Sequence, residues 1–203
     1  DAATAAGVVA GALNAFGMEG SQAIVVVDQL AGAANASQAN ITDLANGFQQ
    51  AGFAFNAGNQ SAADLSTSLA ALTKVGLTGA DSGTALKNAM MALMAPTSAA
   101  ASEMAKYGIN VRDSSGNMLP MQSIIGIFQE KLGSLSPALR DSALKTILMG
   151  DGMKAMIPLM NLGADGFGKL KDEVTQAGSA QALAQAQMAG FNGAMGGLSN
   201  AVE

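Results

Sequence analysis

The segment Val75–Met94 reads VGLTGADSGTALKNAMMALM, with three glycines in its first half and three methionines in its second. Leu86, Met90 and Leu93 recur at the three- and four-residue spacing of a buried helical stripe. The glycines precede that stripe and follow another apolar helical run, and Gly76 can take the left-handed conformation that ends a helix. The segment therefore predicts a corner between two helices.

A phosphate-binding loop is the alternative for this segment, because Gly79 and Gly83-Thr84 are similar to the end of such a motif. That motif needs a lysine to meet the phosphates and a strand before the loop, and the sequence supplies neither. We therefore expect a structural corner. Comparable corners recur along the chain, and the predicted corner residues are Gly17, Gly20, Gly76, Gly79, Gly83, Gly108 and Gly163.

Apolar residues at helical spacing predict further helices on both sides of this corner. The stripes run from Ile41 to Phe55, from Leu65 to Leu72 and from Met121 to Leu132. Short polar residues that can accept the free amides of a first turn precede the helices, at Asn40, Ser61, Thr78 and Ser136.

Two stretches depart from the helical pattern. Ile24–Val27 is a β-branched run, but the spacing around it is helical, so we expect it to be part of a helix. Pro158 predicts a kink or a break in a helix that begins near Asp151. The predicted fold class is mainly α: an array of short amphipathic helices joined by glycine corners as αα-hairpins.

One short segment predicts β structure. Residues 109–120 read INVRDSSGNMLP, with apolar residues on both sides of a cluster that favours turns. We expect a small β-hairpin near residues 109–119, with Asp113, Gly116 and Asn117 in its turn. A calcium loop needs several acidic oxygens, and Asp113 is the one acid in this segment.

Charge and composition exclude several classes of function. The 203 residues include 15 acidic and 10 basic side chains, for a net charge of −5, and no basic run occurs. Sequence-specific nucleic-acid binding is not expected, because neutralising phosphates needs clustered Lys and Arg. The absence of His and Cys removes the commonest general base and all thiolate chemistry. We expect neither a metal site nor a cofactor.

No pair of side chains predicts catalysis. Ser142 and Lys145 have a Ser-x-x-Lys spacing in which an amine could activate a serine, but the Lys-Thr-Gly that accompanies it is absent. Asp172 and Glu173 would point about 100° apart on a helix, so they do not form a paired acid and base. We expect no catalytic residue and no enzyme activity.

The end of the chain predicts a longer helix. Ala184, Met188, Phe191, Met195, Leu198 and Val202 alternate steps of four and three, which is the seam of a coiled coil or an ordinary core stripe. We expect residues 1–178 to form one helical region, with a candidate internal boundary near residues 96–108. Residues 179–203 are expected to form a helix that continues past the end. Asp1 in place of Met indicates an excised fragment, and residues 1–18 lack the positive charge of a signal peptide.

The order of these motifs resembles the core region of bacteriophage tail tape measure proteins, in the family named for a lactococcal siphophage. The most specific parts are GADSGTAL at Gly79–Leu86 and DSSGNM at Asp113–Met118. Further matches are ALNAFGM upstream and FNGAMGGLSNAVE at the end, so the resemblance covers almost the whole chain.

The resemblance implies a structural role in the virion. Such proteins fill the tail tube during assembly, set its length and leave ahead of the DNA, often reaching the host envelope. The implied partners are the phage tail tube protein, tail-tip or baseplate proteins, tail assembly chaperones and further copies of the chain. The implied locations are the tail lumen, the host cytoplasm during assembly and the host envelope at ejection.

A stand-alone helical protein that inserts into membranes and forms pores is the alternative. Gly193 and Gly197 form a GxxxG face, and the thirteen methionines could repack between lumen and membrane, although filling gaps in a core is their ordinary use. Chance accounts for GxxxG pairs in a chain with 25 glycines, and no window of 18 strongly apolar residues occurs. We therefore expect a tape measure region that is folded back on itself, not the extended ruler segment.

Overall fold

The computed structural model describes residues 2–185, and its regular structure is helical. The elements are α1 (Ala2–Phe16), the short 3₁₀ helix η1 (Gly20–Gln22), α2 (Ala23–Ser37), α3 (Ile41–Ala57), α4 (Ala62–Thr73), α5 (Gly79–Met94), α6 (Ser98–Tyr107), α7 (Met121–Leu132) and α8 (Pro137–Val174). A further helical stretch covers residues 179–185. The predicted mainly α class is confirmed, and Ile24–Val27 lies within α2.

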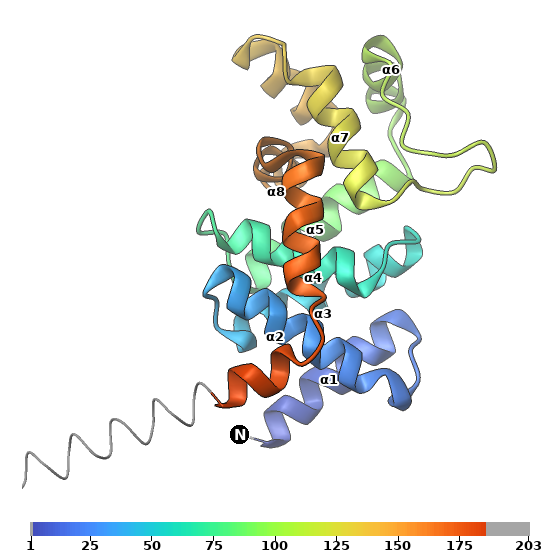
Figure 1. The fold of residues 1–203 in the computed structure, drawn as a ribbon. Helices are drawn as coiled ribbons and strands as arrows, with labels where there is room; N and C mark the ends of the chain where they lie inside the picture. Colours follow the sequence, from blue (N-terminus) through green and yellow to red (C-terminus); the bar gives the residue numbers. More distant parts are fainter. Residues whose placement is uncertain (1, 186–203) are drawn as a thin grey trace, which may run out of the picture.

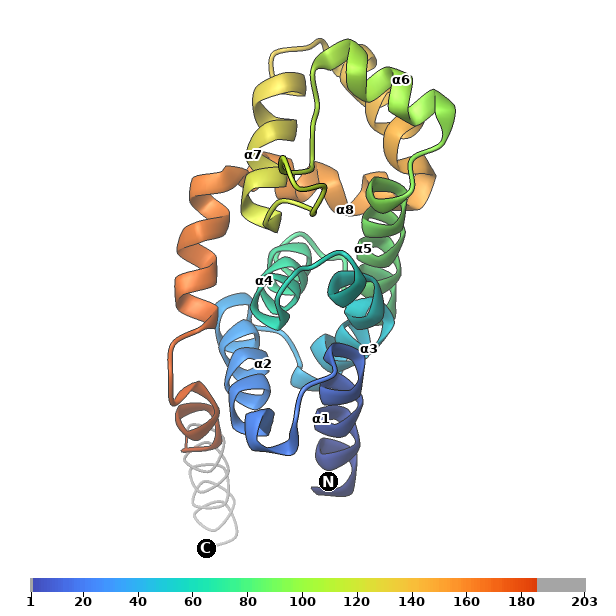
Figure 2. The same ribbon diagram turned by 90° about the vertical axis from the view of Figure 1, so that its right-hand side faces the viewer.

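Helix α4 lies at the centre of the molecule, with α2, α3, α5 and α8 packed around it (Figures 1 and 2). All residues from Ala62 to Leu72 are buried, whereas the spacing of the leucines predicts burial of a single stripe. The hydroxyls of Thr67 and Ser68 donate to backbone carbonyls one turn earlier, at 2.7 Å in each case. Buried hydroxyls cost little once they are bonded, so α4 tolerates the burial of Thr67 and Ser68, whereas the buried hydroxyl of Ser66 has no hydrogen-bond partner among the described residues.

An ion pair ties α4 to the last turn of α8. Lys171 Nζ lies 2.8 Å from Asp64 Oδ1, and the side chain of Asp64 is only 6% exposed. The same carboxylate accepts hydrogen bonds from the hydroxyl and the amide of Ser61, at 2.6 and 3.1 Å, and so forms the capping box of α4. Asp64 therefore fixes both the start of α4 and the position of α8.

Helix α8 has three straight pieces, residues 137–148, 150–162 and 164–174 (Figure 2). Its backbone leaves the helical conformation at Met149 (φ 59°, ψ −177°) and at Gly163 (φ 74°, ψ 170°). The predicted break at Pro158 is wrong, because Pro158 lies inside the middle piece and keeps helical backbone angles. Proline removes one amide donor, but its fixed φ near −65° is itself helical, so packing decides where the chain bends.

Five helices end in the same kind of turn. A residue with positive φ follows α1, α2, α3, α4 and α6, and the next amide donates to the carbonyl five residues back, as from Leu77 to Leu72 at 3.1 Å. The residue with positive φ is Gly17, Gln38, Asn59, Gly76 and Gly108 in turn. At Gln38 and Asn59 the residue with positive φ is not glycine, although Gly58 precedes Asn59, so a search for glycines with positive φ misses these two corners.

The remaining predicted corner glycines have other positions. Gly79, with a φ of 57°, begins α5 and belongs to the corner of Gly76. Gly20 begins η1 without a positive φ, and Gly163 makes the second break of α8.

The prediction of a corner at Gly83 is wrong, because Gly83 lies inside α5 and is buried. A Cβ atom at this position would lie 2.3 Å from the carbonyl oxygen of Gly47 in α3. Glycine is needed here because the backbones of α3 and α5 touch.

The predicted β-hairpin at residues 109–119 is not formed. This segment contains no strand, only an isolated antiparallel bridge between Arg112 and Met118. The carboxylate of Asp113 accepts the amides of Ser115 and Asn117 at 2.8 and 2.9 Å, and Gly116 between them has a φ of 86°. The segment therefore closes into a loop held by a side chain, and strand pairing does not extend beyond one bridge.

Arg112 ties this loop to the neighbouring helix. Its guanidinium donates to the carbonyl of Gly116 and to the carbonyl of Met94 at the end of α5, at 2.7 Å in each case. The second bond satisfies one of the free carbonyls that every helix leaves at its C-terminus.

The buried apolar residues form one cluster from Ala12 in α1 to Val174 in α8. The cluster includes residues on both sides of the segment 96–108, and Phe48, Phe55, Phe128 and Phe167 are its largest fully buried side chains. Of the predicted coiled-coil seam, Ala184 lies in the described part; Met188, Phe191, Met195, Leu198 and Val202 lie outside the described residues. Across residues 2–185 no helix combines the length and the apolar character needed to span a bilayer.

Candidate functional site

The fold does not bring together the side chains that were considered as catalytic candidates. Ser142, Lys145, Asp172 and Glu173 are exposed, and none of them lines the pockets that follow. Among residues 2–185, no three His, Cys, Asp or Glu side chains are grouped as a metal ion would require.

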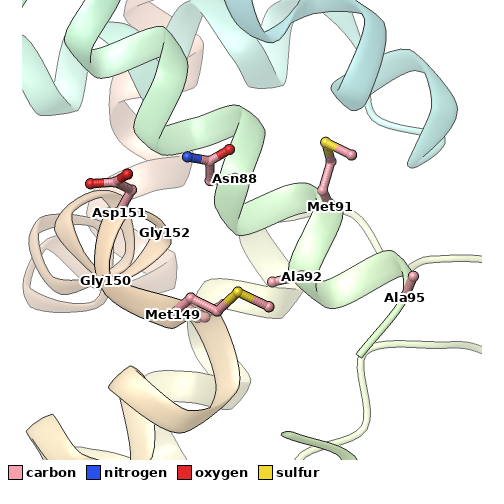
Figure 3. Close-up of a pocket in the computed structure, with 9 residues that line it drawn as sticks. Asn88, Met91, Ala92, Ala95, Met149, Gly150, Asp151 and Gly152 are labelled. Atoms are coloured by element: carbon pink, nitrogen blue, oxygen red, sulfur yellow. The ribbon is translucent and has the colours of Figure 1, made fainter. Parts of the chain in front are cut away.

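Three pockets lie along the middle piece of α8. The first, of about 520 Å³, lies between α5 and the corner at Met149 (Figure 3) and is lined by Asn88, Met91, Ala92, Ala95, Leu148, Met149, Gly150, Asp151 and Gly152. The second, of about 280 Å³, is lined by Leu77, Asp81, Thr84, Ala85, Asp151 and Lys154. The third, of about 430 Å³, is lined by Ala71, Lys74, Val75, Pro158, Asn161 and Leu162.

The pockets follow one face of this helical piece. Asp151, Lys154, Pro158 and Asn161 are separated by three, four and three residues, which places them on the same side of a helix. We call this face and the three pockets beside it the α8 surface.

Exposed apolar side chains lie at both ends of the α8 surface. Met91 and Met149 are each 54% exposed at the first pocket, and Val75 and Leu162 are 62% and 36% exposed at the third. Figure 3 shows Met91 on α5 and Met149 on the facing corner of α8. Methionine side chains are flexible and polarisable, so they adapt to different apolar partners.

The backbone at Met149 is strained. Its φ of 59° with a ψ of −177° lies in a region that is essentially restricted to glycine, at a cost of about 1–3 kcal/mol for other residues. Packing on both sides holds it there: Leu148 is buried, and a Cβ at Gly152 would lie 2.9 Å from the Cα of Ala89 in α5. The side chain of Met149 therefore points outward at a corner that the neighbouring contacts determine.

The charged side chains that line the pockets of the α8 surface are Lys74, Asp81, Asp151 and Lys154. Lys154 Nζ donates to Asp151 Oδ1 at 2.8 Å, and this hydrogen bond raises the pKa of Lys154 above its usual value. An exposed pair of this kind is well hydrated and contributes little to stability. The exposed apolar side chains at the two ends of the α8 surface are suited to contact with another molecule.

Sequence reasoning missed this surface. The methionine spacing in Val75–Met94 indicates a buried stripe, yet Met91 lies outside that stripe, and Gly150, Asp151 and Gly152 after Met149 are a turn signal that could have located the corner. The predicted corner glycines Gly76 and Gly79 do flank Leu77, which lines the second pocket.

Comparisons with known proteins agree on one family. The family model described as phage-related minor tail protein matches residues 1–148. The tape measure protein of Pneumococcus phage Dp-1 is 26% identical over 186 residues, which is 91% of this chain and 16% of that protein. No solved structure matches the chain. Because the family model covers most of its length, the chain belongs to the phage-related minor tail protein family, and it is similar to a bacteriophage tape measure protein.

Proposed function

We propose that the chain is a folded module of a tape measure protein, which occupies the lumen of the tail tube, sets tail length during assembly and is released ahead of the DNA at ejection. The observation that carries this proposal is the similarity to a tape measure protein along 91% of the chain. Because the chain spans only 16% of that relative, other parts of the protein supply most of its length.

Within such a protein, this module is not the ruler. A continuous helix adds about 1.5 Å per residue, so 100 residues of it extend a tail by about 150 Å. Here the chain reverses at the corners after α1, α2, α3 and α4, and the helices share one core. The length of this module therefore does not grow in proportion to its residues.

A surface with few charges suits a lumen through which DNA passes. Charged residues make up 12% of the chain, and its net charge is −5. Because the sequence contains no basic run, the protein offers few counterion-releasing contacts to phosphates. DNA can then move past it without being held.

The ruler assignment is tested with one insertion at two places in the phage gene. A 42-residue helical insert in a segment outside this module should lengthen the tail by about 63 Å. The same insert between Ser114 and Ser115, at the exposed tip of the loop, should leave tail length unchanged, because loop tips accept insertions without altering the core. Tail lengths are measured in electron micrographs.

Both insertions have outcomes that contradict the proposal. Equal lengthening by the two inserts would make this region part of the ruler. If neither insert lengthens the tail, the protein does not set tail length.

We further propose that the α8 surface contacts other tail components, namely the tail tube protein, tail-tip or baseplate proteins, assembly chaperones or further copies of the chain. Its exposed Met91 and Met149 are the supporting observation. A photo-crosslinking residue placed at Met149 should join the tail tube protein in assembled tails, and the same residue at exposed Glu130 on α7 serves as the control. Equal crosslinking at both positions would argue against a specific surface.

A further inference from the structure

The helical stretch at residues 179–185 begins without a cap of its own. The carbonyl of Gly178 accepts the amide of Ala182 at 3.0 Å, which makes Gly178 the residue at the N-cap position. Gly178 has a φ of 82° and no side chain to offer. By contrast, α3, α4, α6 and α8 are capped by side chains of their own N-cap residues, Asn40, Ser61, Thr97 and Ser136.

Asp28 in α2 supplies the missing cap. Its carboxylate accepts the amide of Gly178 at 3.2 Å and the amide of Ala180 at 3.0 Å, across 150 and 152 residues of sequence. Ala180 is the second residue of the stretch, which is an amide that an N-cap side chain normally satisfies. The negative charge also faces the positive end of the helix dipole.

One turn further along α2, Gly32 receives the end of α8. A Cβ atom at Gly32 would lie 2.2 Å from the carbonyl oxygen of Val174, so only glycine permits this backbone contact. Asp28 and Gly32 are four residues apart and therefore lie on one face of α2. The chain crosses this face as it leaves α8 (Figure 2).

Residues 175–185 add little to the core. Val174 is the last described member of the buried cluster, and among residues 175–185 Ser179 is buried and Leu183 packs against the cluster from outside. The hydrogen bonds to Asp28 thus carry a large part of what holds residues 175–185 in place. Segments with so few buried contacts open locally, at a lower free energy than the core.

We propose that Asp28 and Gly32 form a clasp for the outgoing chain, and that residues 175–185 are a strap that detaches from α2 as a unit while α2–α8 stay folded. The clasp fixes the position of residues 175–185 on α2, and its release frees them.

Amide hydrogen exchange of the 203-residue chain tests the clasp, with Asp28→Ala compared with the parent. Loss of a capping carboxylate should speed exchange at residues 178–185 by about 3- to 30-fold and leave the amides of α4 within about twofold. Asp28→Asn keeps one acceptor oxygen and should give a smaller increase. Asp172→Ala removes an exposed acid with no side-chain bond on the last turn of α8, so it serves as the matched control.

Gly32→Ala tests the second half of the clasp, because its methyl group must push Val174 away. It should speed exchange at residues 175–185 and also lower the overall stability. The proposal is overturned if Asp28→Ala leaves residues 178–185 unchanged, or if α4 accelerates by the same factor. It is equally overturned if Asp172→Ala loosens the strap as much as Asp28→Ala.

Discussion

Glycine ends helices at some positions of this chain and permits contact between two backbones at others. Gly17, Gly76 and Gly108 end helices with positive φ, and an apolar run followed by glycine predicts that use. Gly32 and Gly83 lie inside helices where another backbone touches them. This close contact depends on a segment far along the chain, so no local sequence pattern predicts it.

Gly83→Ala should destabilise the protein by at least about 2 kcal/mol, because the new methyl group would meet the carbonyl and Cα of Gly47 at 2.3 and 2.7 Å. Alanine has a higher helix propensity than glycine, so propensity alone would make Gly83→Ala stabilising. A measured loss of stability would therefore have to come from the steric contact with Gly47. Urea unfolding followed by circular dichroism measures the change. Gly150→Ala is the control, since its Cβ would meet nothing within 4 Å, and it should be neutral or slightly stabilising.

Lys171→Met should lower the free energy of unfolding by about 1–3 kcal/mol. The buried carboxylate of Asp64 loses its cation but keeps the hydroxyl of Ser61, and Lys171 is itself 32% exposed, so the loss is smaller than for a fully buried pair. Lys154→Met breaks a pair of the same 2.8 Å length on the surface and should have no measurable effect. Equal losses in the two variants would contradict the role given to Asp64.

At the scale of the element, the sequence predicts a helix well and its surroundings poorly. Asn40, Ser61 and Ser136 cap helices as their positions predict, because an N-cap bond is made within three residues. Thr78 occupies an N-cap position but its side chain makes no capping bond. The all-round burial of α4 follows from what packs around it, and spacing within one helix cannot reveal that.

The loop at residues 109–119 should be sensitive to acid. Hydrogen bonds from the backbone, above all from Asn117, hold the pKa of Asp113 below its usual value of 3.8. A lowered pKa means that the ionised carboxylate stabilises the loop fully above the usual pKa, and that this contribution is lost as pH falls through the lowered pKa. NMR titration of the amides of Ser115 and Asn117 measures this, and Asp113→Asn should remove the transition. A midpoint at or above the usual value would contradict the bonding described.

At the scale of the whole molecule, we propose that the candidate boundary near residues 96–108 does not divide the protein into separate folding units. The connection between α5 and α6 lies there, but the buried cluster runs through both sides of it. Arg112 bonds the end of α5 and Gln60 donates to the carbonyl of Leu119 at 3.0 Å, so polar contacts cross it as well.

Urea unfolding should therefore show a single transition. Circular dichroism at 222 nm reports on all helices, and fluorescence reports on Tyr107, the single tyrosine, at the end of α6. The two curves should superimpose, as they do when a domain unfolds without intermediates. Earlier loss of the Tyr107 signal would show that α6 and α7 unfold separately.

The α8 surface is formed only when distant parts of the chain fold together. Val75, Met91 and Met149 come from three parts of the chain, and each alone is an ordinary apolar residue. Sequence reasoning could assign the family, because motifs are local. It could not find this surface, because the surface is created by the path of α8.

The central position of α4 has a consequence for synthesis of the protein. About 100 residues separate α4 from the end of α8, and a ribosome needs about 5–20 s to add them. Until then the face of α4 that α8 covers has no native partner, and its apolar surface stays exposed to solvent. We therefore expect the nascent chain to depend on chaperones that bind its exposed apolar surface. Slowing translation after residue 75 should increase aggregation of the protein.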